Sequence, residues 1–126
     1  MYIAMNRFQV KKGREKDFEK IWKKRETRLD EVDGFEEFHL IKGETQENYT
    51  LYVSHSTWNS KEDFIDWTKS DAFRKAHEGV GEQRDVYLGH PIFEGFEVFV
   101  TAKICPLVVF FLQSNFIVSP FSIMNE

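Results

Sequence analysis

Residues 60–77 have the sequence SKEDFIDWTKSDAFRKAH, which contains two short helical patterns joined end to end. Each pattern starts with a serine, Ser60 or Ser70, whose hydroxyl can accept a hydrogen bond from an unpaired amide of the first helical turn. An acidic residue follows each serine within that turn, where it interacts favourably with the helix dipole. We therefore expect a helix starting at Ser60, bent or broken before a second helical stretch over residues 72–77.

Strand-like segments lie on both sides of this helical region. Residues 35–42 and 48–58 precede it and are joined by a turn at residues 43–46, so they predict an antiparallel hairpin. Residues 92–100 follow a loop that contains several glycines, and their apolar side chains, Ile92, Phe96, Val98 and Val100, fall largely on one face. This segment predicts the last strand of the domain.

The N-terminal third predicts one strand and one helix. Residues 2–10 are rich in strand formers and would place Tyr2, Ala4, Asn6 and Phe8 on a common face. After the turn at Lys11-Lys12-Gly13, side chains recur at helical spacing and predict an amphipathic helix that ends near Asp33-Gly34. Its apolar positions are Phe18, Ile21, Trp22, Arg25 through its aliphatic stem, and Leu29.

The order strand, helix, strand, strand, helix, strand predicts an α+β, ferredoxin-like βαββαβ fold with both helices on one face of an antiparallel sheet. The other face of the sheet would then be exposed unless another element packed on it. A second copy of the chain is the simplest cover, because identical chains usually associate with twofold symmetry. We therefore expect a homodimer that forms a dimeric α+β barrel.

Composition limits the possible partners and compartments. The 126 residues are 41% apolar and fit one domain, and the net charge of -4 argues against a nucleic-acid partner. The single cysteine, Cys105, cannot form an intramolecular disulfide, and the N-terminus lacks the pattern of a secretory signal, so we expect a cytoplasmic protein. Prolines and amide side chains interrupt the apolar residues 104–121, which argues against a membrane span.

The candidate chemistry is concentrated on the histidines. The sequence contains no activated nucleophile, zinc cluster or phosphate-binding loop, and its paired glutamates are expected on the solvated surface. His39 and His55 lie in predicted strands and His90 precedes a proline, whereas His77 ends a helix beside small residues. The His77 imidazole either faces an apolar slot with room for a flat macrocycle, as a ligand, or is a helix-capping side chain that interacts with the dipole.

Trp67 and Asn6 each allow both a structural and a functional interpretation. Trp67 follows Phe64 at helical spacing and is either a core residue or part of a ligand site. Asn6 is unusual because asparagine is depleted in strands and its amide needs partners when buried. It indicates an edge position, a hydrogen-bonded bridge to the backbone, or a polar group that faces a ligand.

These positions together resemble a known family. The stretch Met5-Asn6-Arg7-Phe8 and residues 60–77 are similar to the IsdG-type heme-degrading monooxygenases of the antibiotic biosynthesis monooxygenase superfamily. The family's Asn, Trp and His fall on Asn6, Trp67 and His77. The spacing from Trp67 to His77 with an intervening Ser-Asp-x-Phe is more specific than any one of the three residues.

The resemblance implies a function and a role for each residue. His77 would be the axial ligand of heme iron, Trp67 would distort the porphyrin, and Asn6 would donate a hydrogen bond near iron-bound oxygen. Phe64, Phe73 and Val80 would complete the heme-binding pocket. Heme would be both substrate and oxygen activator, with electrons supplied by a reductase or a small reductant, and the products would be iron and an open-chain tetrapyrrole.

The resemblance covers about residues 1–100, which we interpret as the catalytic domain, and residues 101–126 form an extension of unknown role. Two alternatives remain open at this point. One is an enzyme of the same superfamily that oxidises a quinol or another aromatic compound without heme. The other is a non-catalytic heme-binding protein that uses the same pocket.

Overall fold

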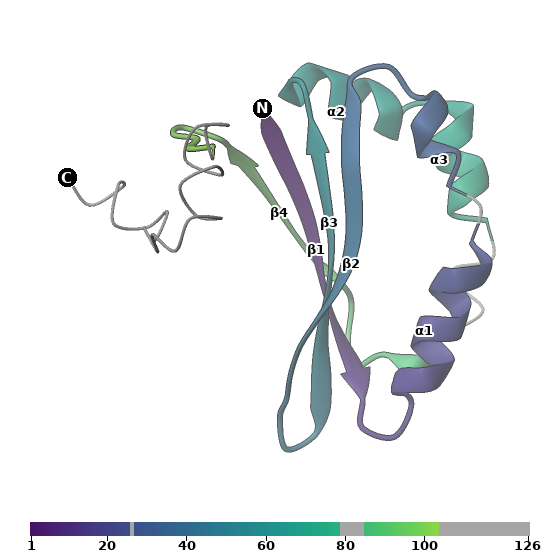
Figure 1. The fold of residues 1–126 in the computed structure, drawn as a ribbon. Coiled ribbons are helices and arrows are strands. Elements are labelled where there is room, and N and C mark those ends of the chain that lie inside the picture. The colour runs from purple at the N-terminus through teal and green to yellow at the C-terminus, as the bar shows by residue number, and fades with distance from the viewer. Residues whose placement is uncertain (26, 79–84, 104–126) are drawn as a thin grey trace, which may run out of the picture.

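The predicted ferredoxin-like arrangement is confirmed in a computed structural model, which describes residues 1–25, 27–78 and 85–103. Figure 1 shows one sheet with helices on a single face. The elements are β1 (Tyr2–Lys11), α1 (Glu15–Lys24), the 3-10 turn η1 (Leu29–Glu31), β2 (Phe35–Thr45), β3 (Tyr49–Trp58), α2 (Lys61–Thr68), α3 (Asp71–Ala76) and β4 (Ile92–Glu97). The strand order is β2-β3-β1-β4, and each neighbouring pair is antiparallel.

The two serine caps form as expected. Ser60 Oγ accepts a hydrogen bond from the Asp63 backbone amide at 3.1 Å, and Ser70 Oγ accepts one from the Phe73 amide at 3.2 Å. The chain therefore breaks between α2 and α3, as the sequence predicts.

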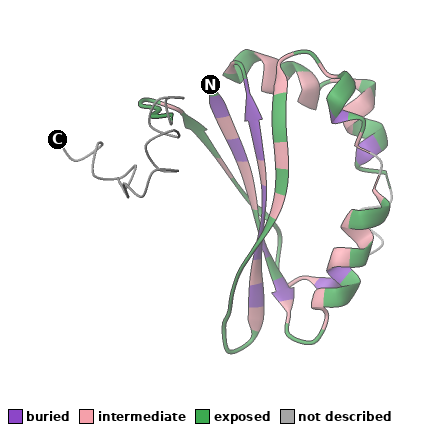
Figure 2. Ribbon diagram, in the orientation of Figure 1, coloured by how far each residue is buried: buried purple, intermediate pink, exposed green. Residues whose placement is uncertain are grey.

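Successive side chains of a strand point to opposite faces of the sheet, so every second residue of the central strands β1 and β3 faces the helices. On β1, Tyr2, Ala4, Phe8 and Val10 are buried, and β3 is the most continuously buried strand (Figure 2). The opposite side carries Ile3 and Met5 on β1, together with the exposed Ile41, Ile92 and Phe96 on the outer strands. No helix of the described part covers that side in Figure 1.

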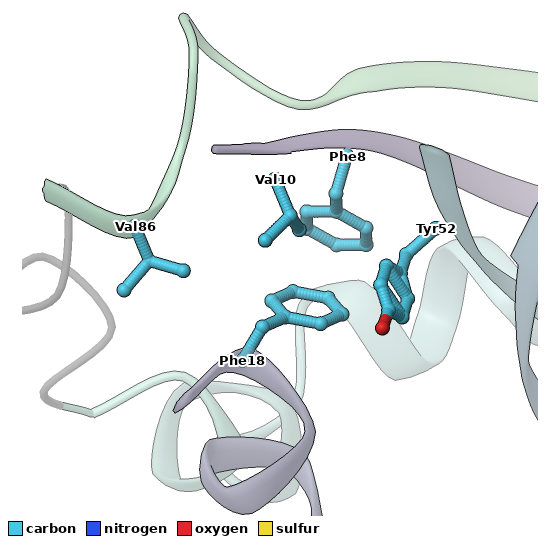
Figure 3. Close-up of a cluster of buried hydrophobic side chains, with 5 residues drawn as sticks. All are labelled: Phe8, Val10, Phe18, Tyr52 and Val86. Carbon is cyan, nitrogen blue, oxygen red and sulfur yellow. The ribbon is translucent and has the colours of Figure 1, made fainter. Parts of the chain in front are cut away.

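The core is divided into two clusters. One lies under α1 and consists of Phe8, Val10, Phe18, Tyr52 and Val86, which point toward one another in Figure 3. The other contains Tyr2, Ala4, Leu29 and Trp58, with Phe64 and Trp67 of α2 packed against it. Between the clusters the sheet presents small or polar side chains, Asn6, Ser54 and Ser56, which leave room between the layers.

The prediction of a helix extending to Asp33-Gly34 is wrong. α1 ends at Lys24, Arg25 is extended with φ -74° and ψ 124°, and Arg28 adopts a left-handed conformation with φ 49° before the 3-10 turn. Phe18 packs in the first cluster whereas Leu29 packs in the second. Tertiary packing therefore overrides the helical periodicity, because the chain leaves the helix to reach the second cluster.

Two strand ends also differ from the predictions. β4 stops at Glu97 rather than at residue 100, because Glu97 pairs with Tyr2 and β1 offers no strand residue beyond it. β2 continues to Thr45 instead of residue 42, past an irregularity in its pairing with β3. The hairpin turn therefore lies nearer residue 46.

Most of the C-terminal extension, residues 104–126, lies outside the described residues, as does the apolar segment 104–121. No helix in the described ranges is long and apolar enough to span a membrane.

Candidate functional site

A cavity of about 840 Å³ lies between the helices and the sheet, where the two core clusters leave space. This volume is within the usual range for small-molecule sites. Asn6, Trp67 and His77, predicted from distant parts of the sequence, all line it, as do Phe64 and Phe73. Val80, the remaining predicted pocket residue, lies outside the described residues.

His77 follows α3 as its C-cap residue, and Phe73 orients its side chain. The His77 backbone amide donates to the Phe73 carbonyl at 3.1 Å, and the imidazole Nδ1 lies 2.8 Å from the same oxygen. A carbonyl oxygen only accepts hydrogen bonds, so Nδ1 carries the proton and Nε2 keeps its lone pair in the neutral ring. The Phe73 ring stacks on the imidazole with centroids 4.0 Å apart. The capping interpretation and the ligand interpretation are therefore compatible.

Trp67 is both a core residue and a cavity residue. Its ring centroid lies 5.3 Å from that of Trp58 and 4.9 Å from that of Phe73, and the His77 ring is 6.2 Å away. The indole N–H of Trp67 is buried, and it has no acceptor in the described part of the chain. A buried donor without a partner costs about 1–3 kcal/mol, so the packing of Trp67 carries this cost.

Asn6 lies on β1 between Ala4 and Phe8, opposite Ser54 on β3 and Phe93 on β4. Because β1 is an interior strand, the edge interpretation is wrong. The Asn6 side chain is half-buried, lines the cavity and makes no hydrogen bond within the described ranges. An amide held in this way is available to a molecule that occupies the cavity.

Arg25 is a cavity residue that the sequence analysis assigned only to the apolar face of a helix. Its guanidinium lies 4.1 Å from the centre of the Trp22 ring, and no carboxylate of the described residues lies within ion-pair distance of it. Burial lowers the pKa of Arg25, and the nearby Tyr87 opposes this shift. The sequence signal that Arg25 could line the cavity was a cationic residue at a position where helical spacing predicts an apolar side chain.

The cavity lining includes both aromatic and polar side chains. Trp58, Phe64, Trp67 and Phe73 give it aromatic walls near His77. Arg25 and Tyr87 are close enough for each to affect the pKa of the other, and burial raises the pKa of Tyr87. His90, which the sequence analysis left in a loop without a role, also lines the cavity. The cavity therefore combines aromatic surface with the cationic side chain of Arg25.

The other chemical candidates do not reach the cavity. Alternation directs Phe38, Ser54 and Ser56 toward it, so their neighbours His39 and His55 project from the opposite side of the sheet. Glu19 accepts a hydrogen bond from the Tyr52 hydroxyl at 2.7 Å, which gives this carboxylate a structural role.

Comparisons with known proteins agree with this fold. The sequence pattern of the antibiotic biosynthesis monooxygenase family matches residues 1–79. A staphylobilin-producing heme oxygenase of Staphylococcus saprophyticus is 36% identical over 80 residues, which cover 63% of this chain and 75% of that protein. A heme-degrading monooxygenase of Shouchella clausii is 31% identical over 96 residues, 73% of this chain and 85% of that protein. The heme degrader MhuD of Mycobacterium tuberculosis, solved with two hemes bound in its active site, is 24% identical with a TM-score of 0.63, covering 82% of this chain and 100% of that chain.

Proposed function

This chain belongs to the antibiotic biosynthesis monooxygenase family, and we propose that it binds heme and cleaves the porphyrin ring oxidatively. The observation that carries the proposal is the position of His77. Its Nε2 is unprotonated in the neutral ring, and its side chain lines the same cavity as Trp67 and Asn6. The sequence similarity to proteins named as heme oxygenases and heme-degrading monooxygenases supports the same assignment.

The cavity residues match the chemical groups of heme. Heme iron accepts a neutral imidazole as an axial ligand, the porphyrin is flat and apolar, and its two propionates are anionic. His77 supplies the imidazole, Trp67 and Phe73 supply aromatic surface, and Arg25 supplies a cation. The cavity volume of about 840 Å³ lies within the usual range for small-molecule sites.

His77 would hold the iron through Nε2 while Phe73 fixes the ring from the other side. A hydrogen bond from the second ring nitrogen to a carbonyl fixes the tautomer and the orientation of a metal-binding histidine. Because the Phe73 carbonyl is part of the α3 backbone, the orientation of the imidazole depends on the helix that Ser70 caps. Arg25 would pair with a propionate, with its guanidinium kept over Trp22.

Trp67 and Asn6 would act on the porphyrin and on bound oxygen. Trp67 is held by Trp58 and Phe73, so it presents a rigid surface that can press on the macrocycle. The Asn6 amide would donate a hydrogen bond into a largely apolar site, where such a bond has its greatest effect. Heme is the substrate and, when bound, also supplies the iron that activates dioxygen. We propose that an external reductant supplies the electrons and that iron and an open-chain tetrapyrrole are released.

Addition of hemin followed by ascorbate in air, with catalase present to remove free peroxide, tests this function. We expect a shift of the Soret band on binding, then bleaching of the band with release of iron. An unshifted Soret band would contradict heme binding and favour a non-heme oxygenase of the same family. A shifted band that persists under ascorbate would favour a heme carrier.

We also propose that two chains associate through the sheet face that the helices leave bare. Ile41, Ile92 and Phe96 expose apolar surface there, next to Ile3 and Met5. An apolar sheet face of this kind favours twofold association of identical chains. Sedimentation velocity should give a mass near twice the chain mass of 15.0 kDa. A mass of one chain at every protein concentration would contradict the dimer.

A further inference from the structure

A groove of about 1110 Å³ lies next to the proposed heme cavity and is lined by residues of α1, α3 and the segment around η1. Both α1 and α3 lie on the helical side of the sheet (Figure 1). Arg25, Thr27 and Ala76 line both the groove and the cavity, and Ala76 directly precedes His77. His77 and Trp67 line the cavity but not the groove. The groove is therefore a separate concavity that borders the proposed heme site.

Part of the groove lining is apolar. α1 contributes Ile21, α3 contributes Ala72 and Ala76, and Val32 and Val86 come from connecting segments. Ala76 and Val86 are buried, and the other three are half-buried. This surface can contact the apolar body of an organic ligand, whereas a small inorganic ion would leave it without a partner.

The rest of the lining is rich in cations, although the chain as a whole has a net charge of -4. Arg14 is compensated, because it pairs with Asp17 at 2.7 Å and with Asp85 at 3.1 Å. Five further cations of the lining make no ion pair with a carboxylate of the described residues: Lys20, Lys24, Arg25, Arg28 and Lys75. The other lining carboxylates are Glu31 and Glu78. The groove therefore has an excess of positive charge, which attracts an anionic ligand.

We propose that this groove binds the open-chain tetrapyrrole after ring cleavage, an inference that rests on the proposed function. The product keeps the apolar pyrroles and the two carboxylates of heme, so it matches a lining that is both apolar and cationic. It has lost the iron, so the bond to His77 no longer holds it in the cavity. The shared residues Arg25, Thr27 and Ala76 place the groove at the border of the cavity, where the product can pass from one to the other.

Equilibrium dialysis of the full chain, loaded with one hemin and kept without reductant, tests the groove with biliverdin as the probe. Hemin fills the cavity, so any further tetrapyrrole has to bind elsewhere. Chromatography of the protein compartment quantifies both ligands. We expect one biliverdin per hemin-loaded chain, with the hemin retained. High salt should weaken the binding of biliverdin, because exposed charges are screened.

The triple variant Lys24→Gln/Arg28→Gln/Lys75→Gln removes three exposed cations that line the groove and not the cavity. Lys61→Gln, at the exposed start of α2 and outside the groove lining, is the matched control. Each exposed ion pair contributes a factor of about 1.4 to 5 in affinity, so the triple variant should bind biliverdin about tenfold more weakly. Its affinity for hemin should equal that of the parent. Biliverdin dimethyl ester, which lacks the carboxylates, should bind equally to the parent and the triple variant.

Displacement of hemin by biliverdin, without binding to the hemin-loaded chain, would overturn the proposal, because the product would then occupy the heme cavity. Equal affinity for biliverdin in the parent and the triple variant would overturn it as well. Neither result bears on heme degradation, which the Soret band and the release of iron measure. If hemin failed to bind, the proposed heme function would fail, and titration of the hemin-free parent and triple variant with biliverdin would still test the groove.

Discussion

The imidazole Nδ1 of His77 lies 2.8 Å from the carbonyl oxygen of Phe73, one helical turn earlier. In the neutral ring this contact places the proton on Nδ1 and leaves the Nε2 lone pair free, in a side chain that lines the cavity. Metal-binding histidines use the same arrangement, in which the second nitrogen is held by a hydrogen bond.

Replacement of His77 by Ala should weaken heme binding and abolish turnover, because a methyl group cannot coordinate iron. Hemin titration followed by optical spectroscopy measures the binding. Added imidazole is the matched control, since it can fill the vacated space as a free ligand and should restore part of the parent spectrum. A ferric spectrum and a turnover rate equal to those of the parent would refute the ligand assignment.

The Asn6→Ala variant should still bind heme, because His77 and the aromatic walls remain. Turnover should fall on the order of a hundredfold, the usual effect of losing one well-placed hydrogen bond to a reacting oxygen. Single-turnover bleaching under ascorbate measures the rate. Asn6→Asp, which keeps the size but cannot donate from an ionised carboxylate, should also be slow. Parent rates in both variants would remove Asn6 from the mechanism.

Two substitutions at Trp67 separate its possible roles. Trp67→Ala removes the surface proposed to press on the porphyrin and should reduce turnover strongly. Trp67→Phe keeps a large aromatic ring beside Trp58 and Phe73, so it should retain more activity than Ala. Thermal unfolding must accompany both assays, because Trp67 also packs in the core. Equal turnover in the two variants, with both folded, would argue against a steric role.

Arg25→Ala should weaken the affinity for hemin, because the cavity loses the cation proposed to pair with a propionate. The burial that lowers the pKa of Arg25 also strengthens its interaction with an anion at neutral pH. Hemin dimethyl ester, which lacks the carboxylates, is the matched ligand control, and the parent and the variant should bind it equally. A loss of affinity that is the same for hemin and its ester would assign Arg25 to packing against Trp22.

The order of elements and the serine caps could be predicted because they depend on local chemistry. Ser60 and Ser70 each accept a hydrogen bond from a backbone amide three residues later, within the same helical turn. The end of α1 could not be predicted, since it depends on Leu29 packing in a different cluster from Phe18. The strand order also lies beyond local patterns, and it puts Asn6 on an interior strand.

The site was predicted in part. The resemblance identified Asn6, Trp67 and His77, which the fold brings to one cavity, although their roles remain proposals. Arg25 was missed as a site residue because helical periodicity placed it on a helix that ends one residue earlier. The cavity itself depends on small side chains at Ser54 and Ser56 that face the helices from β3, a feature visible only when the strands are aligned.

The most direct test of heme degradation is single turnover of the hemin-loaded chain with ascorbate under ¹⁸O₂, with catalase present. Mass spectrometry of the tetrapyrrole and chelator titration of the iron are measured on the same sample. We predict an open-chain tetrapyrrole that carries ¹⁸O, with one iron released for each heme consumed. Hemin recovered intact, or bleached without incorporation of ¹⁸O, would contradict the assignment of this chain as a heme-degrading monooxygenase.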